Sequence, residues 1–232
     1  MDRTDSFTRD LISEAIRSLI DDIAREHFDA ATQEHQLTSR ICGALEAKFS
    51  TAWFSNRRVR VITQEFPDKG PGSAEKKTGV DLYVGIEIDG PDPVSKGLLV
   101  QSKWKETARS GAEHRRLVGQ CEQMTARSPA SYVWLYGPEG VEVVPAGEVV
   151  SSTISPPESL GSRKISELFR NVLDCFEGDP AIGLPRGLSG SATRRALKAM
   201  IAELAARSGI LISIGSTREP EPYEPIDWNP EA

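Results

Sequence analysis

Residues 78–105, TGVDLYVGIEIDGPDPVSKGLLVQSKWK, decide the fold of this chain. Two runs rich in β-forming residues, 80–88 and 97–104, flank the segment 89–93, which consists of turn-forming residues. This arrangement is typical of an antiparallel hairpin. Side chains alternate between the two faces of a strand, so Asp81 falls on the face opposite the apolar residues of the first run. The sequence therefore predicts a hairpin with a carboxylate at the start of its first strand.

Three polar side chains meet at the open end of this hairpin. If the turn is centred near residues 91–92, Asp81 lies roughly opposite Gln101 and Lys103, which share one face of the return strand. A carboxylate, an amide and an ammonium are then neighbours. A half-buried strand seldom gathers three such groups without a use for them. We therefore predict a catalytic site formed by Asp81, Gln101 and Lys103.

The motif resembles a known family of enzymes. Gly-Val-Asp at 79–81, a hairpin, and Val-Gln-Ser-Lys at 100–103 are similar to the PD-(D/E)XK superfamily of metal-dependent nucleases. The variant is the Gln-x-Lys form of Mrr-type restriction enzymes and anti-phage nuclease effectors. The resemblance covers roughly residues 34–123. It implies an α/β fold with a restriction-endonuclease-like core, in which helices flank a mixed central sheet.

The same resemblance implies an activity and its cofactor. The expected protein is an endonuclease, a hydrolase that cleaves DNA phosphodiester bonds with Mg²⁺ or Mn²⁺, in antiviral defence against foreign DNA. A divalent cation neutralises the scissile phosphate and activates water near neutral pH. Lys103 would orient the attacking water or stabilise the charged transition state.

The metal ligands follow from the same motif. Asp81 is the principal ligand, and the backbone carbonyl of Ser102 is suited to supply a second oxygen. Gln101 offers an amide oxygen where most relatives have a carboxylate, which removes one negative charge. An accessory carboxylate from Glu34 or Glu75 would compensate. The first resembles the acidic motif of the superfamily's first helix, and the second precedes Asp81 by six residues. Both also have ordinary readings, as a helix N-terminal acid and a loop carboxylate.

Basic residues follow the motif closely. Five lie between positions 103 and 116, against two acids, which is the charge pattern of a phosphate-contacting surface. Further basic clusters at 57–60 and 76–77 bracket the predicted site. The expected nucleic-acid contacts are Lys105, Arg109, Arg115, Arg116 and Gln120.

Two other interpretations keep most of these observations. In one, Asp81 is a strand-end cap, Lys103 is its ion-pair partner and Gln101 is merely exposed. That interpretation leaves the basic clusters and the order of elements as coincidences. In the other, the fold is that of a nuclease but the site has decayed, and the chain is a nucleic-acid-binding or assembly subunit.

Composition describes an ordinary soluble protein. The chain has 232 residues, 38% hydrophobic and 27% charged, with a net charge of −6 that argues mildly against nucleic-acid binding. No apolar run approaches the ~20 residues of a membrane helix, and the start lacks a secretion signal. The three cysteines are widely spaced and are interpreted as reduced thiols. We expect a cytoplasmic protein with DNA as its partner and no membrane contact. Another subunit, an activating sensor protein or a second copy are further candidates.

Periodicity predicts the remaining organisation. We expect one nuclease domain over residues 1–217, with helical N- and C-terminal additions, and a disordered tail over 218–232, which is rich in proline and acids. The apolar stripe of the first helix is expected to include Leu11 and Leu19, and Asp29 or Thr32 to cap the second. The expected helices are 6–25, 32–49, 112–127, 166–176 and 192–207, and the expected further strands are 59–66, 131–135, 141–144 and 210–214.

Overall fold

The computed structural model describes residues 6–50, 52–65, 79–106, 108, 111–152, 156–188 and 190–215. Its strands are β1 (Ala52–Phe54), β2 (Arg57–Glu65), β3 (Leu82–Ile88), β4 (Val94–Trp104), β5 (Ser131–Gly137), β6 (Gly140–Pro145), β7 (Arg163–Lys164) and β8 (Ser208–Gly215). Within the described residues they form one mixed sheet in the order β1-β2-β8-β3-β4-β5-β6-β7. The predicted tail at 218–232 lies outside these residues.

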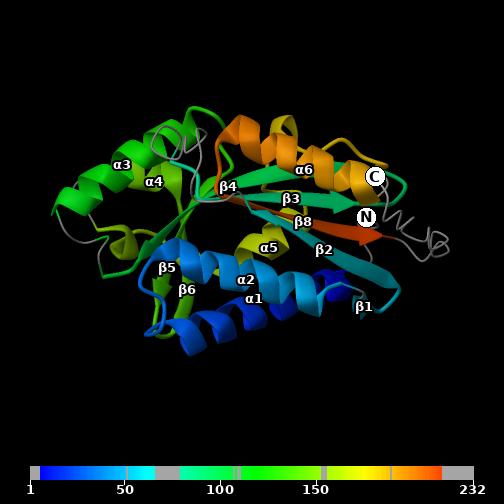
Figure 1. The fold of residues 1–232 in the computed structure, drawn as a ribbon, viewed down its shortest axis with the longest axis horizontal. Helices are drawn as coiled ribbons and strands as arrows, with labels where there is room; N and C mark the ends of the chain where they lie inside the picture. The colour runs from blue at the N-terminus through cyan, green and yellow to red at the C-terminus, as the bar shows by residue number, and fades with distance from the viewer. Residues whose placement is uncertain are drawn as a thin grey trace, which may run out of the picture.

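Helices cover both faces of the sheet (Figure 1). One layer consists of α1 (Ser6–His27), α2 (Glu34–Lys48) and α5 (Ile165–Leu173), and the other of α3 (Gly111–Thr125), α4 (Ala146–Ser151) and α6 (Gly190–Leu204). Two short 3-10 helices, Pro157–Ser159 and Pro180–Ile182, lie in connections. The expected α/β class, with helices flanking a mixed sheet, is confirmed. No helix in the described part of the chain is both long and apolar enough to cross a membrane.

The hairpin forms as predicted. Strands β3 and β4 pair antiparallel with Leu82 opposite Val100 and Ile88 opposite Val94, which centres the turn at position 91. Both faces of β3 are buried, because one faces the α1–α2–α5 layer and the other the α3–α4–α6 layer. The strand is therefore more enclosed than the half-buried strand that the sequence suggested.

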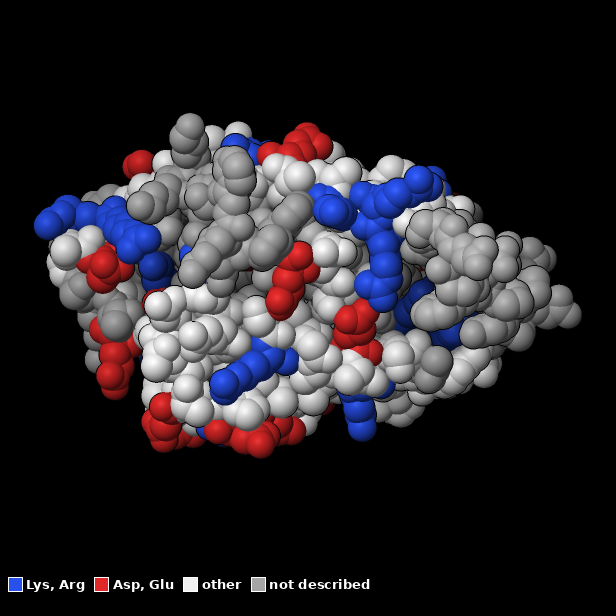
Figure 2. All heavy atoms as spheres, viewed as in Figure 1, with Lys and Arg blue, Asp and Glu red and all other residues white. Residues whose placement is uncertain are grey.

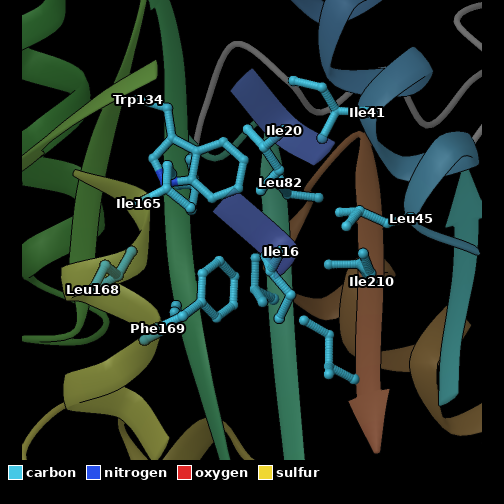
Figure 3. Packing of buried hydrophobic residues seen from close by; sticks show 14 of the residues in the cluster. Ile16, Ile20, Ile41, Leu45, Leu82, Trp134, Ile165, Leu168, Phe169 and Ile210 are labelled. Atoms are coloured by element: carbon cyan, nitrogen blue, oxygen red, sulfur yellow. The ribbon is translucent and has the colours of Figure 1, made fainter. Parts of the chain in front are cut away.

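The larger core lies between the sheet and the layer of α1, α2 and α5. Figure 3 shows Ile16 and Ile20 of α1 and Ile41 of α2 packed over Leu82 and Ile210 of neighbouring strands. Each such side chain contributes roughly 1.5–3 kcal/mol when fully buried.

The predicted stripe of α1 lies at the margin of the buried face. Leu11 is 39% exposed and Leu19 is partly buried against the core, whereas Ile12, Ile16 and Ile20 are fully buried. Two parallel apolar ridges run along this helix, and packing against α2 and α5 selects the one that starts at Ile12.

The cap expected for α2 is also different. The helix starts at Glu34 with Gln33 as its N-cap residue, not Asp29 or Thr32, and no side chain of the cap accepts a hydrogen bond. Instead, the backbone N–H of Thr32 donates to Gln36 Oε1 at 3.1 Å. The stripe of α2 nevertheless faces the core as predicted.

The last described strand occupies an unexpected place. β8 inserts between β2 and β3, antiparallel to the first and parallel to the second. The sequence predicted a strand here but not its partners, and it did not predict β1, β7 or α4. Because β8 runs parallel to β3, the starts of both strands lie at the edge of the sheet where β4 ends. The C-terminal part of the chain thus reaches the predicted site.

Candidate active site

The start of β3 and the end of β4 lie side by side at one edge of the sheet. The β3–β4 ladder ends where Leu82 pairs with Val100, and Asp81 N–H also donates to Val100 O at 2.9 Å, which fixes Asp81 beside the end of β4. Asp81, Gln101 and Lys103 share the face of the sheet that α3 and α6 cover, and all three line one cavity of about 220 Å³. The structure thus brings the predicted catalytic trio together.

The Asp81 carboxylate is held in place by the opposite strand. Its Oδ2 accepts hydrogen bonds from the backbone N–H of Ser102, at 2.9 Å, and from Nε2 of Gln101. The amide of Gln101 is only 3% exposed, and its Oε1 is buried without a hydrogen-bond partner. A buried acceptor without a donor is costly, so this oxygen is a candidate ligand for a cation.

Burial raises the pKa of Asp81 to about 6. The Ser102 N–H and the charges of Lys103 and Arg116 oppose this rise, while the charge of Glu34 adds to it. Desolvation penalises the ionised form and outweighs the favourable contacts. A cation bound beside Asp81 would lower this pKa, because its positive charge stabilises the ionised carboxylate in place of the missing water.

Lys103 is buried in the same cavity, and its ion pair within the described residues is a long one. The residue is 6% exposed, and its Nζ lies 3.8 Å from Glu113 Oε2. Arg116 Nη1 lies 3.9 Å from the same carboxylate oxygen. Both separations exceed a hydrogen bond. The ammonium is therefore positioned by the fold and still able to bind a ligand oxygen.

Of the two accessory carboxylates, the structure describes only Glu34. It is the first residue of α2 and lines the cavity, and its charge acts on Asp81. Glu75 lies outside the described residues. The helix N-terminus brings Glu34 to the end of β4, although α2 covers the opposite face of the sheet.

The residues predicted to contact nucleic acid do not all lie in one place. Arg116 and Gln120 of α3 line the cavity, whereas Arg115 is exposed on the same helix outside it. Lys105 lies in a separate cavity and donates to Glu142 Oε1 at 2.5 Å. Arg109 lies outside the described residues. Only part of the expected basic group therefore adjoins the predicted catalytic residues.

Charges of both signs are spread over the surface in Figure 2. A group of basic side chains lies over α6, where Arg194, Arg195 and Lys198 are exposed. Arg194 is partly neutralised, because it lies 3.1 Å from Glu46 Oε1. The surface therefore has local basic areas although the net charge of the chain is negative.

Arg207 and Gly79 contribute to the site although neither was among the predicted site residues. Arg207 precedes β8 and lines the cavity, and the next residue, Ser208, donates its N–H to the backbone oxygen of Asp81 at 3.1 Å. Gly79 has φ +69°, and a Cβ there would lie 2.6 Å from Gln120 O. The Gly-x-Asp pattern carried a signal for the glycine, since only glycine allows this approach to α3. The arginine had no local signal, because its place depends on the parallel β3–β8 pairing.

The oxygen donors around Asp81 suit a hard divalent cation. Asp81, Glu34 and Gln101 Oε1 are oxygen ligands of the kind that Mg²⁺ prefers. The N–H and C=O of a strand residue point to the same side, so the Ser102 carbonyl faces Asp81 as its N–H does. Within the described residues, no group of three or more His, Cys, Asp or Glu side chains is arranged to hold a metal. A cation here would therefore need the amide and the backbone oxygen as well as the two carboxylates.

Comparisons with models of protein families, with curated proteins and with solved structures gave no match to this chain. The lining of the cavity combines the oxygen groups of Asp81, Glu34 and Gln101 with three cations, the buried Lys103 of β4, the exposed Arg116 of α3 and the half-buried Arg207 before β8.

Proposed function

We propose that this protein is a metal-dependent endonuclease of the PD-(D/E)XK type, in its Gln-x-Lys variant, with a restriction-endonuclease-like core. Its substrate is DNA, and its role is the antiviral defence that the motif implies. One observation carries the proposal: Asp81, Gln101 and Lys103 line one cavity, and Glu34 joins them from a different layer of the fold. A simple strand-end ion pair would require neither the fourth residue nor a cavity.

The residues divide the work of holding a cation. Asp81 and Glu34 supply negative charge, and Gln101 Oε1 and the Ser102 carbonyl supply neutral oxygens. Bound Mg²⁺ or Mn²⁺ would provide a Lewis acid for the phosphate and a more acidic water. Gln101 also donates to Asp81 Oδ2, so it orients the carboxylate as well as offering an oxygen.

The cations of the cavity act on the substrate. Lys103, which is nearly enclosed, can orient water or stabilise charge on the phosphoryl oxygens, because a fixed cation in a poorly solvated site needs no reorganisation. Arg116 and Arg207 line the cavity and can contact phosphate oxygens with their planar guanidinium groups. Arg115, outside the cavity, is suited to a sequence-independent contact with the DNA backbone.

A second candidate is a nucleic-acid-binding or assembly subunit with a decayed site. One observation favours it: the described lining of the cavity offers a cation few carboxylates. Besides Asp81 and Glu34 it contains Glu113, which lies near the positive charges of Lys103 and Arg116. A site with an amide at position 101 carries less negative charge than one with a carboxylate there, and this lowers its affinity for a hard cation.

Cleavage assays separate the two functions. Purified protein is incubated with supercoiled plasmid, linear duplex, single-stranded DNA and RNA, each in EDTA, Mg²⁺ or Mn²⁺. The nuclease proposal expects DNA cleavage that requires metal and that Asp81→Ala abolishes, with Asp92→Ala in the exposed hairpin turn as the matched control. DNA binding without cleavage in either metal would favour the decayed site. Neither binding nor cleavage would overturn both.

A further inference from the structure

Three buried hydroxyl groups lie together next to the cavity. Thr38 comes from α2, Ser102 from β4 and Tyr136 from β5, and none of them is more than 1% exposed. Thr38 Oγ1 lies 3.0 Å from Ser102 Oγ and 2.8 Å from the Tyr136 hydroxyl, and the latter two oxygens are 3.3 Å apart. These hydroxyls are well removed from water, so their partners must come from one another and from the backbone.

The directions of the hydrogen bonds follow from a count of protons. Thr38 donates its single hydroxyl proton to the backbone oxygen of Glu34 at 3.1 Å, because a carbonyl can only accept. Burial raises the pKa of Tyr136, so the phenol keeps its proton. Ser102 and Tyr136 can then both donate to Thr38 Oγ1. The three hydroxyl protons then account for the three shorter contacts as hydrogen bonds. The 3.3 Å contact between Ser102 and Tyr136 has no proton of its own.

This cluster connects the two backbone segments on which the site depends. Ser102 supplies the N–H that holds Asp81 and the carbonyl that faces it. Glu34 lies one helical turn before Thr38 and carries the second carboxylate of the cavity. Among the described contacts, Thr38 is the side chain that bonds to both segments. A shift of α2 along the sheet would therefore move Glu34 relative to Asp81.

Core packing alone does not require the hydroxyl of Thr38. The neighbours Leu37 and Ile41 on α2 belong to the apolar core, and valine has almost the same shape as threonine. A buried hydroxyl must recover its lost hydration through hydrogen bonds, so valine would be the simpler choice for stability alone. The hydroxyl lies where α2, β4 and β5 converge.

We propose that Thr38 is a positioning residue that sets the separation of the Glu34 and Asp81 carboxylates through its bonds to Glu34 O and Ser102 Oγ. The inference rests on the proposed metal site. Outer groups that orient ligands typically change metal affinity 10- to 100-fold when they are removed. Thr38 acts through the backbone of two ligand-bearing segments and does not touch the cation.

Titration calorimetry with MgCl₂ and MnCl₂ tests this role on the full chain, independently of cleavage. Thr38→Val should bind either ion about tenfold more weakly or worse, and Thr38→Ser, which keeps the hydroxyl, should stay within about threefold of the wild type. Tyr136→Phe keeps the ring and should show a smaller loss, about threefold. The matched control is Thr193→Val in α6, a buried threonine that donates to Leu188 O away from the cavity. It should bind metal as the wild type does.

Urea unfolding of the same variants in EDTA separates positioning from general stability. If Thr38→Val binds metal like the wild type, the positioning role is overturned, whatever its stability. If Thr38→Val does not fold, Tyr136→Phe decides, and unchanged metal affinity in that variant overturns the role. A wild type that binds neither ion, and matches Asp81→Ala in the calorimeter, would instead overturn the metal site itself. The two failures are therefore distinguishable.

Discussion

Two buried lysines on the same strand, Lys96 and Lys103 of β4, have different surroundings. They are 2% and 6% exposed, respectively, and their positions differ by an odd number, so their side chains leave opposite faces of the sheet. Lys96 points into the layer of α1, α2 and α5, and Lys103 into the cavity beside α3. The same residue type on one strand therefore meets two different environments.

Lys96 is bound into the fold. Its Nζ donates to Val172 O in the last turn of α5, an oxygen that also accepts from the backbone N–H of Cys175 at 3.1 Å. Its stem lies so close to Gly178, which has φ +97°, that a Cβ there would be 2.6 Å from Lys96 Cδ. Burial lowers the pKa of Lys96, against the opposing charges of nearby groups including Glu177. This lysine has a partner in the protein and no space for a ligand.

Lys103 lines a cavity. Its nearest carboxylate oxygen in the described structure is 3.8 Å away, on Glu113. Burial by itself therefore does not distinguish a lysine that can bind a ligand. Lys103 differs from Lys96 because it is buried beside an opening, where a hydrogen bond to a ligand can replace the one lost from water.

The largest expected effect tests this contrast directly. Lys103→Ala should reduce plasmid cleavage about a thousandfold, because a positioned cation or water-orienting group is lost. Lys96→Ala should leave the cleavage rate of folded protein unchanged but reduce the free energy of unfolding by about 3 kcal/mol, since the buried stem leaves a void. Rates come from plasmid assays and stabilities from urea titration. The distinction between the two lysines would be contradicted if folded Lys96→Ala protein cleaved more slowly than the wild type, or if Lys103→Ala cleaved at the normal rate.

The second effect concerns the carboxylate that faces Lys103. The pKa of Asp81 is about 6 in the folded chain against 3.8 ordinarily, so its stabilising contribution is complete below pH 3.8 and lost as the pH rises through 6. Asp81→Asn should therefore be more stable than wild type at pH 8 in EDTA, by up to about 3 kcal/mol. The advantage should shrink between pH 6 and 4. Urea unfolding across this range measures it, and a variant that is less stable at pH 8 would contradict the assigned burial of Asp81.

The smallest effect sharpens the role of the amide beside Lys103. Gln101→Glu sets a second carboxylate against Asp81 and should tighten Mg²⁺ binding about tenfold, or roughly 1.4 kcal/mol. The new charge can also pair with Lys103, so the maximal rate is expected to fall even as less Mg²⁺ is needed. Gln101→Ala should need more Mg²⁺. Titration of cleavage against Mg²⁺ measures both, with exposed Gln123→Glu on α3 as the control. Identical titrations of all variants would exclude Gln101 as a ligand.

Much of the site could be predicted because its main parts are close in sequence. The alternation in residues 80–88, the turn residues and the return strand determine the hairpin register, and that register brings Asp81 to the end of β4, where Gln101 Nε2 donates to it. The stripe of α2 likewise placed Glu34 near the edge of a buried face. The predicted stripe of α1 is only partly buried, because the helix has two neighbouring apolar ridges and only its tertiary neighbours decide which one is fully enclosed.

What the sequence by itself determined was the set of elements with clear periodicity, the pairing of β3 with β4, and the chemical character of the site. Only the tertiary structure decided that β8 enters the middle of the sheet, that Arg207 reaches the cavity, and that Lys105 faces elsewhere. It also decided that Thr38 meets Ser102 and Tyr136. The physical reason is that periodicity records which face of an element is buried, whereas partners distant in the chain are selected by the packing of the whole core.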